Sequence, residues 1–104
     1  MAEDLPSPDA FKAAIKSGLS LVDFWADWCG PCKIMAPAFQ EASETFRGRV
    51  AFYKLDVDAV SDVPGELGIT GIPTLVLFKD GGEVDRLVGA VPKARLLAWI
   101  SSHI

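Results

Sequence analysis

The feature that most restricts the fold of this chain is a pair of cysteines that directly follows an apolar run. Residues 19–26 carry apolar side chains on both faces of a predicted strand, which is typical of a central strand covered by helices. Gly30 and Pro31 separate Cys29 from Cys32 and favour a tight turn into a helix. A strand that leads into a helix in this way predicts an α/β fold with a right-handed strand–helix–strand unit.

The two thiols are predicted to form a redox-active pair. On the first turn of a helix, a separation of three residues places both sulfurs on one face, close enough to be bridged without backbone movement. The free N–H groups and positive dipole end of that turn stabilise a thiolate, which lowers its pKa below the ~8.5 of a free thiol. Because Cys29 is nearer to the helix start than Cys32, we expect Cys29 to be the nucleophile.

Two other interpretations of the cysteine pair stay open. The pair could be half of a zinc site, but a closed site takes four ligands and His103 is the only histidine of the chain. The cysteines could also be inert core residues, although Gly30 and Pro31 indicate a turn near the surface. We therefore predict a redox dithiol, with no metal site and no cofactor.

Composition limits the class of protein. A chain of 104 residues, half of them apolar, suits one domain over residues 1–104. Ten basic against fourteen acidic residues, without a basic cluster, argue against binding to nucleic acid or to an anionic membrane. The sequence shows no secretory signal and no stretch of transmembrane length. Without an export signal we expect a cytoplasmic protein, and in such a reducing compartment a cysteine pair is more often catalytic than structural.

Asp23 is a charged residue inside the predicted central strand. Desolvation of its carboxylate is costly, so its pKa is expected to rise toward neutral pH. Because Asp23 precedes Cys29 by six residues and leads toward the same helix, we interpret it as a proton donor and acceptor for the buried thiol. The alternative is an aspartate held by structural hydrogen bonds. Lys54, in a second predicted strand over residues 50–57, is expected either to pair with Asp23 or to extend to solvent.

The N-terminal half supplies two helices around these strands. Pro6 and Pro8 allow at most a short edge strand, and the first helix is expected to be capped by Asp9 and ended by Gly18. The helix that continues from Cys32 has its apolar side chains on one stripe: Met35, Phe39, Ala42 and Phe46.

The C-terminal half predicts a hairpin and a final helix. Residues 58–68 indicate an irregular connection, whereas residues 75–78 and 84–88 predict two strands joined by a tight turn. Pro92 suits the start of the last helix. His103, at the frayed end of that helix, is expected to be solvated.

The motifs, in their order along the chain, resemble the thioredoxin family from about residue 19 to the C-terminus. They are Asp23, residues 28–32, Pro37, Lys54, residues 71–74 and Gly89. The resemblance implies the thioredoxin fold, a mixed sheet of four or five strands with helices on both faces. It also implies a monomer that reduces disulfides in target proteins and is recharged by a separate thioredoxin reductase. The Gly-Pro dipeptide resembles that of reductases, whereas oxidases and isomerases of the family usually carry histidine there.

The resemblance also implies a role for each matching residue. Cys29 matches the exposed attacking thiol and Cys32 the resolving thiol. Asp23 and Lys54 match a buried charged pair behind them, and Pro73 matches a cis-proline that packs against the dithiol. The apolar surface that docks partner proteins is matched by Trp28, Gly30, Pro31, Val57, Gly71, Ile72, Val88 and Gly89.

The chain departs from the family pattern in three places, and two other functions stay open. The N-terminal strand is short and bears prolines, Pro64 and Gly65 interrupt the third helix, and Trp99 lies in the last helix. One rival is a binding module that uses the same surface while its thiols stay idle. The other is a homodimer that joins two dithiols around zinc or an iron–sulfur cluster.

Overall fold

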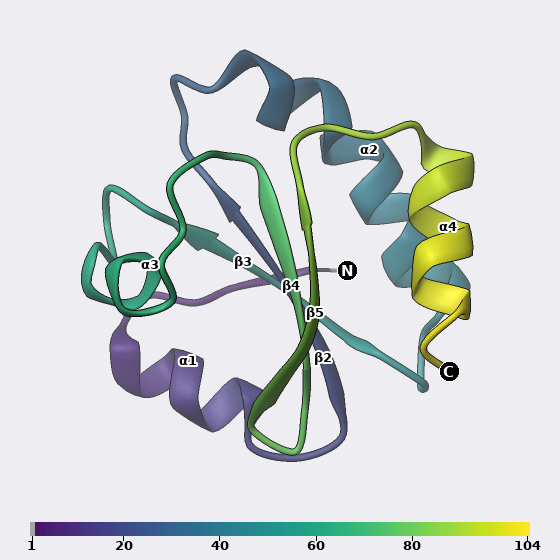
Figure 1. Ribbon diagram of the computed structural model, residues 1–104, viewed down its shortest axis with the longest axis horizontal. Helices are drawn as coiled ribbons and strands as arrows, with labels where there is room; N and C mark the ends of the chain where they lie inside the picture. Colours follow the sequence, from purple (N-terminus) through teal and green to yellow (C-terminus); the bar gives the residue numbers. More distant parts are fainter. Residues whose placement is uncertain (1) are drawn as a thin grey trace.

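A five-stranded mixed sheet forms the centre of the protein (Figure 1). The computed structural model describes residues 2–104. The strand order is β1–β3–β2–β4–β5, with β1 (Glu3–Asp4), β3 (Ala51–Asp56) and β2 (Leu19–Trp25) parallel to one another. β4 (Thr74–Lys79) runs antiparallel to β2 and forms a hairpin with β5 (Gly82–Val88). The predicted mixed sheet is confirmed, with five strands.

Helices cover both faces of this sheet, as predicted. Figure 1 shows α2 (Gly30–Thr45) and α4 (Lys93–Ser101) side by side on one face, with α1 (Pro8–Ile15) and α3 (Asp62–Glu66) on the other. The connection predicted over residues 58–68 contains only the five-residue α3. No helix among residues 2–104 is long and apolar enough to cross a membrane.

The alternation of side chains along β2 divides the core into two clusters and decides where Asp23 points. Val22 and Phe24 pack with residues of α1 and α3, whereas Leu21 packs with residues of α2 and α4. Because successive side chains of a strand point to opposite faces, Asp23 and Trp25 share the face of Leu21. The carboxyl group therefore lies on the side of the sheet that α2 covers.

The start of α1 differs from the prediction. Ser7, rather than Asp9, is the N-cap, and its Oγ accepts a hydrogen bond from the Ala10 backbone N–H at 3.1 Å. Pro8 explains the difference, because proline lacks an N–H and suits the first helical position. The helix therefore begins before Asp9, which becomes a residue of its first turn. Gly18 follows the helix with φ 71°, a conformation that glycine adopts without steric cost.

His103 is not solvated as predicted. Its Nε2 atom lies 2.8 Å from Oδ2 of Asp85, and the Trp99 indole N–H donates to the same oxygen at 2.9 Å. These hydrogen bonds lower the pKa of Asp85, and the one from Trp99 has the largest effect. Asp85 belongs to β5, Trp99 lies in the last turn of α4 and His103 follows that helix, so only the tertiary fold brings them together.

We expect Asp85→Ala to lower the free energy of unfolding at pH 7 by about 1 kcal/mol, the net worth of a typical hydrogen bond. The Asp85 side chain is 43% exposed, so solvent screening keeps the effect small. A depressed folded pKa stabilises the protein above the unfolded pKa, and this stability is lost as pH falls through the folded pKa. Urea unfolding at pH 7 and pH 3 should therefore show a loss that shrinks in acid. Glu44→Ala, an exposed carboxylate on α2, is the control, and equal midpoints of Asp85→Ala and wild type at pH 7 would contradict the role of Asp85.

Candidate active site

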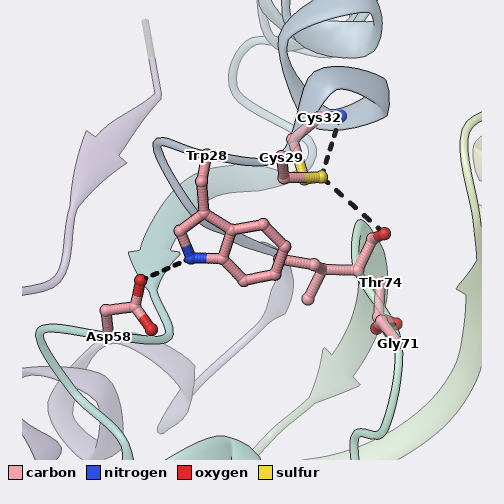
Figure 2. The surroundings of a disulfide bond; sticks show 7 residues. Trp28, Cys29, Cys32, Asp58, Gly71 and Thr74 are labelled. Atoms are coloured by element: carbon pink, nitrogen blue, oxygen red, sulfur yellow. Dashed lines mark hydrogen bonds between the residues drawn. A yellow bond between two sulfur atoms is a disulfide. The ribbon is translucent and has the colours of Figure 1, made fainter.

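The two cysteines lie at the N-terminal end of α2, just after β2 ends. Cys29 is the N-cap of α2 and is joined to Cys32 by a disulfide, with the two Cα atoms 5.3 Å apart. The Cys29 sulfur accepts a hydrogen bond from the Cys32 backbone N–H at 3.2 Å, drawn as a dashed line in Figure 2. A free backbone donor and the positive end of the helix dipole thus meet at Cys29, which is the position that stabilises a thiolate.

The burial of Cys29 differs from the exposed position that the family resemblance implies. Cys29 is 4% exposed and Cys32 is 3% exposed, so in this oxidised state neither is the more accessible. Together with Ala26 they form a buried cluster, against which Trp25, Val57 and Ile72 pack. Exposure therefore does not distinguish the two cysteines, whereas their positions differ because only Cys29 is the N-cap of α2.

Trp28 is an exposed aromatic residue held in place beside the disulfide. It is 70% exposed, yet its indole N–H donates a hydrogen bond to Oδ2 of Asp58 at 2.7 Å (Figure 2). The backbone N–H of Asp58 in turn donates to Oδ1 of Asp56 at 2.9 Å. Asp58 was not among the predicted site residues; the available signal was a polar residue directly after the predicted strand over residues 50–57, next to Val57 of the implied docking surface.

The loop before β4 approaches the dithiol from the other side. Its Ile72–Pro73 peptide bond is cis, as expected, and the carbonyl oxygen of Ile72 lies 3.8 Å from the Cys29 sulfur. The Thr74 hydroxyl donates to the Gly71 carbonyl at 2.6 Å. The backbone N–H of Gly89 donates to the Pro73 carbonyl at 2.8 Å, so this loop is tied to the end of β5.

The residues predicted to dock partner proteins lie at the start of α2, after β3, on the loop before β4 and at the end of β5. Gly30 and Pro31 are exposed at the start of α2, and Val88 is exposed at the end of β5, in register with Thr74. A cavity of about 460 Å³ opens beside Trp28. Of the predicted residues it is lined by Trp28, Val57, Gly71 and Ile72, and of residues that the sequence analysis did not single out for this role by Ser61, Pro64, Gly65, Ile69 and Thr70.

Asp23 is the buried acid of the site. It is 1% exposed, and desolvation raises its pKa to about 7 against the opposing charge of Lys54. Its Oδ1 atom has no hydrogen-bond partner within residues 2–104. That oxygen receives no structural hydrogen bond from these residues, and burial favours the protonated form of the carboxyl group.

Lys54 lies beside Asp23, and of the two arrangements left open by the sequence it does not adopt a direct ion pair. The two residues are in register on β3 and β2, yet no ion pair joins them in the described chain. The Lys54 ammonium instead lies over the Trp25 ring, with Nζ 4.4 Å from the ring centroid. The sequence could not distinguish these arrangements, because Trp25 and Asp23 occupy the same face of β2 and both attract a cation.

A dithiol at a helix start, a buried acid and a cis-proline loop within this α/β fold define a thiol–disulfide oxidoreductase. The family model for thioredoxin matches residues 5–102, and the chain belongs to the thioredoxin family. It is 43% identical to the thioredoxin of Staphylococcus aureus over 94 residues, which cover 90% of each chain.

Solved structures of thioredoxins are similar along the whole chain. The Plasmodium falciparum thioredoxin superimposes with a TM-score of 0.93 at 38% identity, covering 99% of this chain and all of that one. The Malassezia sympodialis thioredoxin does so with a TM-score of 0.89 at 42% identity, covering 99% of this chain and 90% of that one. The protein is accordingly a protein-disulfide reductase, and its partners are in general disulfide-containing proteins and a reductase.

Proposed function

We propose that Cys29 attacks target disulfides and that Cys32 resolves the product. The observation that carries this assignment is the position of Cys29 at the N-cap of α2, where its sulfur accepts the Cys32 N–H. A thiolate there has a lowered pKa and is the better nucleophile. Cys32, one turn into the helix, is the resolving thiol.

The reaction proceeds in two exchanges. The Cys29 thiolate attacks one sulfur of the target disulfide, which forms a mixed disulfide and releases the other target sulfur as a thiolate. Cys32 then loses its proton and attacks the Cys29 sulfur, which closes the Cys29–Cys32 disulfide and releases the second target thiol. Two electrons pass from the dithiol to the target.

Asp23 is proposed to accept the Cys32 proton. A carboxyl group with a pKa of about 7 is close to the working pH, which favours a general acid and base. Asp23 points to the face of the sheet on which α2 carries Cys32. Lys54 modulates this group through its charge.

Targets are proposed to bind as extended segments across the apolar surface around the dithiol. That surface comprises Trp28, Gly30, Pro31, Val57, Gly71, Ile72, Val88 and Gly89. Pro73 is proposed to lie next to the target disulfide that Cys29 attacks. An extended segment uses main-chain hydrogen bonds for affinity and pockets for selectivity, and the cavity beside Trp28 suits one target side chain.

The protein is further proposed to act as a cytoplasmic monomer recharged by thioredoxin reductase. A reducing compartment returns such a dithiol to its active form. The chain has no glycine-rich nucleotide-binding motif. We therefore expect a separate enzyme to supply the electrons, and we expect this chain to bind no cofactor.

Asp58→Ala tests whether the Trp28 ring must be held in place. Loss of one hydrogen bond of about 1 kcal/mol should raise KM for a protein disulfide about fivefold with kcat unchanged. Steady-state kinetics measure both parameters. Asp62→Ala removes an exposed carboxylate from nearby α3 and should leave KM at the wild-type value. An equal rise in both variants would mean that charge, and not the hold on Trp28, affects binding.

The proposed function is tested by coupled turnover. Purified protein, thioredoxin reductase, NADPH and a disulfide-bonded protein substrate should together oxidise NADPH in proportion to the substrate disulfides reduced. The Cys29→Ser/Cys32→Ser double variant is the control and should give the blank rate. Wild type that stays at the blank rate with reductases of several sources would favour the binding module with idle thiols.

A further inference from the structure

The Lys54 ammonium has three aspartates on its own face of the sheet and pairs with none of them. Asp23 on β2 and Asp4 on β1 are both in register with Lys54. Asp56 is the next residue of β3 on the same face, in register with Trp25. No ion pair links Lys54 to any of the three in the part of the chain described. The ammonium lies over the Trp25 ring instead, 4.4 Å from its centroid.

Trp25 also belongs to the surroundings of the dithiol. It is partly buried and packs against the cluster formed by Ala26, Cys29 and Cys32. Its neighbour two residues earlier on the same face is Asp23. The residue that holds the Lys54 ammonium therefore shares a face of β2 with the buried acid and packs against the cluster that contains both cysteines.

We infer that Trp25 is a positioning residue that holds the Lys54 ammonium off the Asp23 carboxylate, so that Asp23 can take up the Cys32 proton. Tryptophan provides the strongest cation–π site among the aromatic residues, and here it competes with the carboxylate for one cation. The inference rests on the proposed role of Asp23 as the base.

The electrostatic consequence has a definite direction. An ammonium in direct contact with a carboxylate favours its ionised form and lowers its pKa by about 1 to 3. A more acidic carboxyl group is a weaker base for a thiol. The ring therefore keeps the lysine near enough to moderate the cost of a buried charge, but not so near that the acid stays ionised.

A double-variant cycle on the intact oxidised protein tests the inference. The pKa of Asp23 is read from the carboxyl ¹³C shift in wild type, Trp25→Met, Lys54→Met and the double variant. Trp25→Met fills much of the ring volume with an apolar chain and has no π face. It should lower the pKa of Asp23 by about 1, because the released ammonium can reach the carboxylate. In the Lys54→Met background the same substitution should leave that pKa unchanged.

The cycle separates positioning from simple water exclusion. Loss of the ring could admit water to Asp23 and lower its pKa without any help from Lys54. In that case the shift would be equal in both backgrounds, which would overturn the inference. No shift in either background would overturn it as well.

A measurement on the unsubstituted protein keeps the test valid if Trp25→Met does not fold. The ε-methylene protons of a lysine over an indole ring are shifted upfield by the ring current. We expect such a shift for Lys54 in wild type and its loss in Trp25→Leu or any other folded variant without the ring. Lys54 protons at ordinary positions in wild type would contradict the inference.

The pH profile of the resolving step distinguishes failure of this inference from failure of the proposed function. Trp25→Met should move the acid limb of that step to lower pH by about 1, in parallel with the pKa of Asp23. A shifted Asp23 pKa with an unmoved rate profile would support the positioning by Trp25 and refute Asp23 as the base.

Discussion

Cys29→Ser should reduce the rate of disulfide reduction to that of a protein-free blank. A serine hydroxyl stays protonated at neutral pH and cannot displace a thiolate from a disulfide, so the first exchange is lost. Cys32→Ser should have a different effect. It retains the attack by Cys29 and loses the thiol that resolves the mixed disulfide.

Target proteins should therefore accumulate as covalent adducts of Cys32→Ser. Non-reducing gels and peptide mass spectrometry would locate the adduct on Cys29. The double serine variant is the matched control and should capture nothing. Adducts that instead form on Cys32 in the Cys29→Ser variant would reverse the two roles, and with them the argument from the helix N-cap.

Asp23→Ala should make the protein more stable at pH 7 and slower in catalysis. Burial raises the folded pKa of Asp23 from 3.8 to about 7. At roughly 1.4 kcal/mol per pH unit, ionisation of this buried group costs the native state about 4 kcal/mol at pH 7. The cavity left by alanine and the loss of the Lys54 attraction offset part of this, so a net gain of about 1 to 3 kcal/mol is expected.

The sign of the pH dependence follows from the raised pKa. The native state binds the Asp23 proton more tightly than the unfolded chain, so this contribution is fully present below the unfolded pKa of 3.8. It is lost as pH rises through the folded value of about 7. The advantage of Asp23→Ala over wild type should therefore shrink toward pH 4.

Urea midpoints and turnover measured from pH 4 to pH 8 decide this prediction. Asp27→Ala removes an exposed aspartate four residues further along the chain and should match wild type in both measurements. An Asp23→Ala variant that is less stable at pH 7 and has unchanged turnover would show that Asp23 has a structural role and is not the base.

The layout of the fold could be predicted because local signals agreed with the tertiary structure. The apolar run of β2, the turn residues before β5 and the prolines near the N-terminus each act within a few residues. Local signals also explain why β1 has two residues and α3 has five. Pro6 and Pro8 limit regular structure around β1, and Pro64 and Gly65 limit it in α3. The mistaken cap of α1 shows the limit of this approach, because Ser7 and Asp9 both have capping side chains.

The cysteines and Asp23 could also be identified from the sequence, because their chemistry conflicts with their surroundings. A carboxylate within an apolar strand and two thiols in a glycine–proline turn each require an explanation. Contacts between distant elements could not be predicted in this way. The bond from Trp28 to Asp58, the placement of Lys54 on Trp25 and the pairing of His103 with Asp85 each join separate elements. The side chains involved have several acceptable partners until the fold selects one.

An equilibrium redox titration of Cys29 and Cys32 tests the central claim most directly. The protein is equilibrated in thiol–disulfide buffers of graded potential, quenched in acid and alkylated. Mass spectrometry then gives the fractions of dithiol and disulfide. We expect one reversible two-electron transition, in which the ratio of dithiol to disulfide changes tenfold for each ~30 mV, and no transition in Cys32→Ser. Thiols that stay alkylatable at every potential, or a disulfide that never reopens, would contradict a redox carrier.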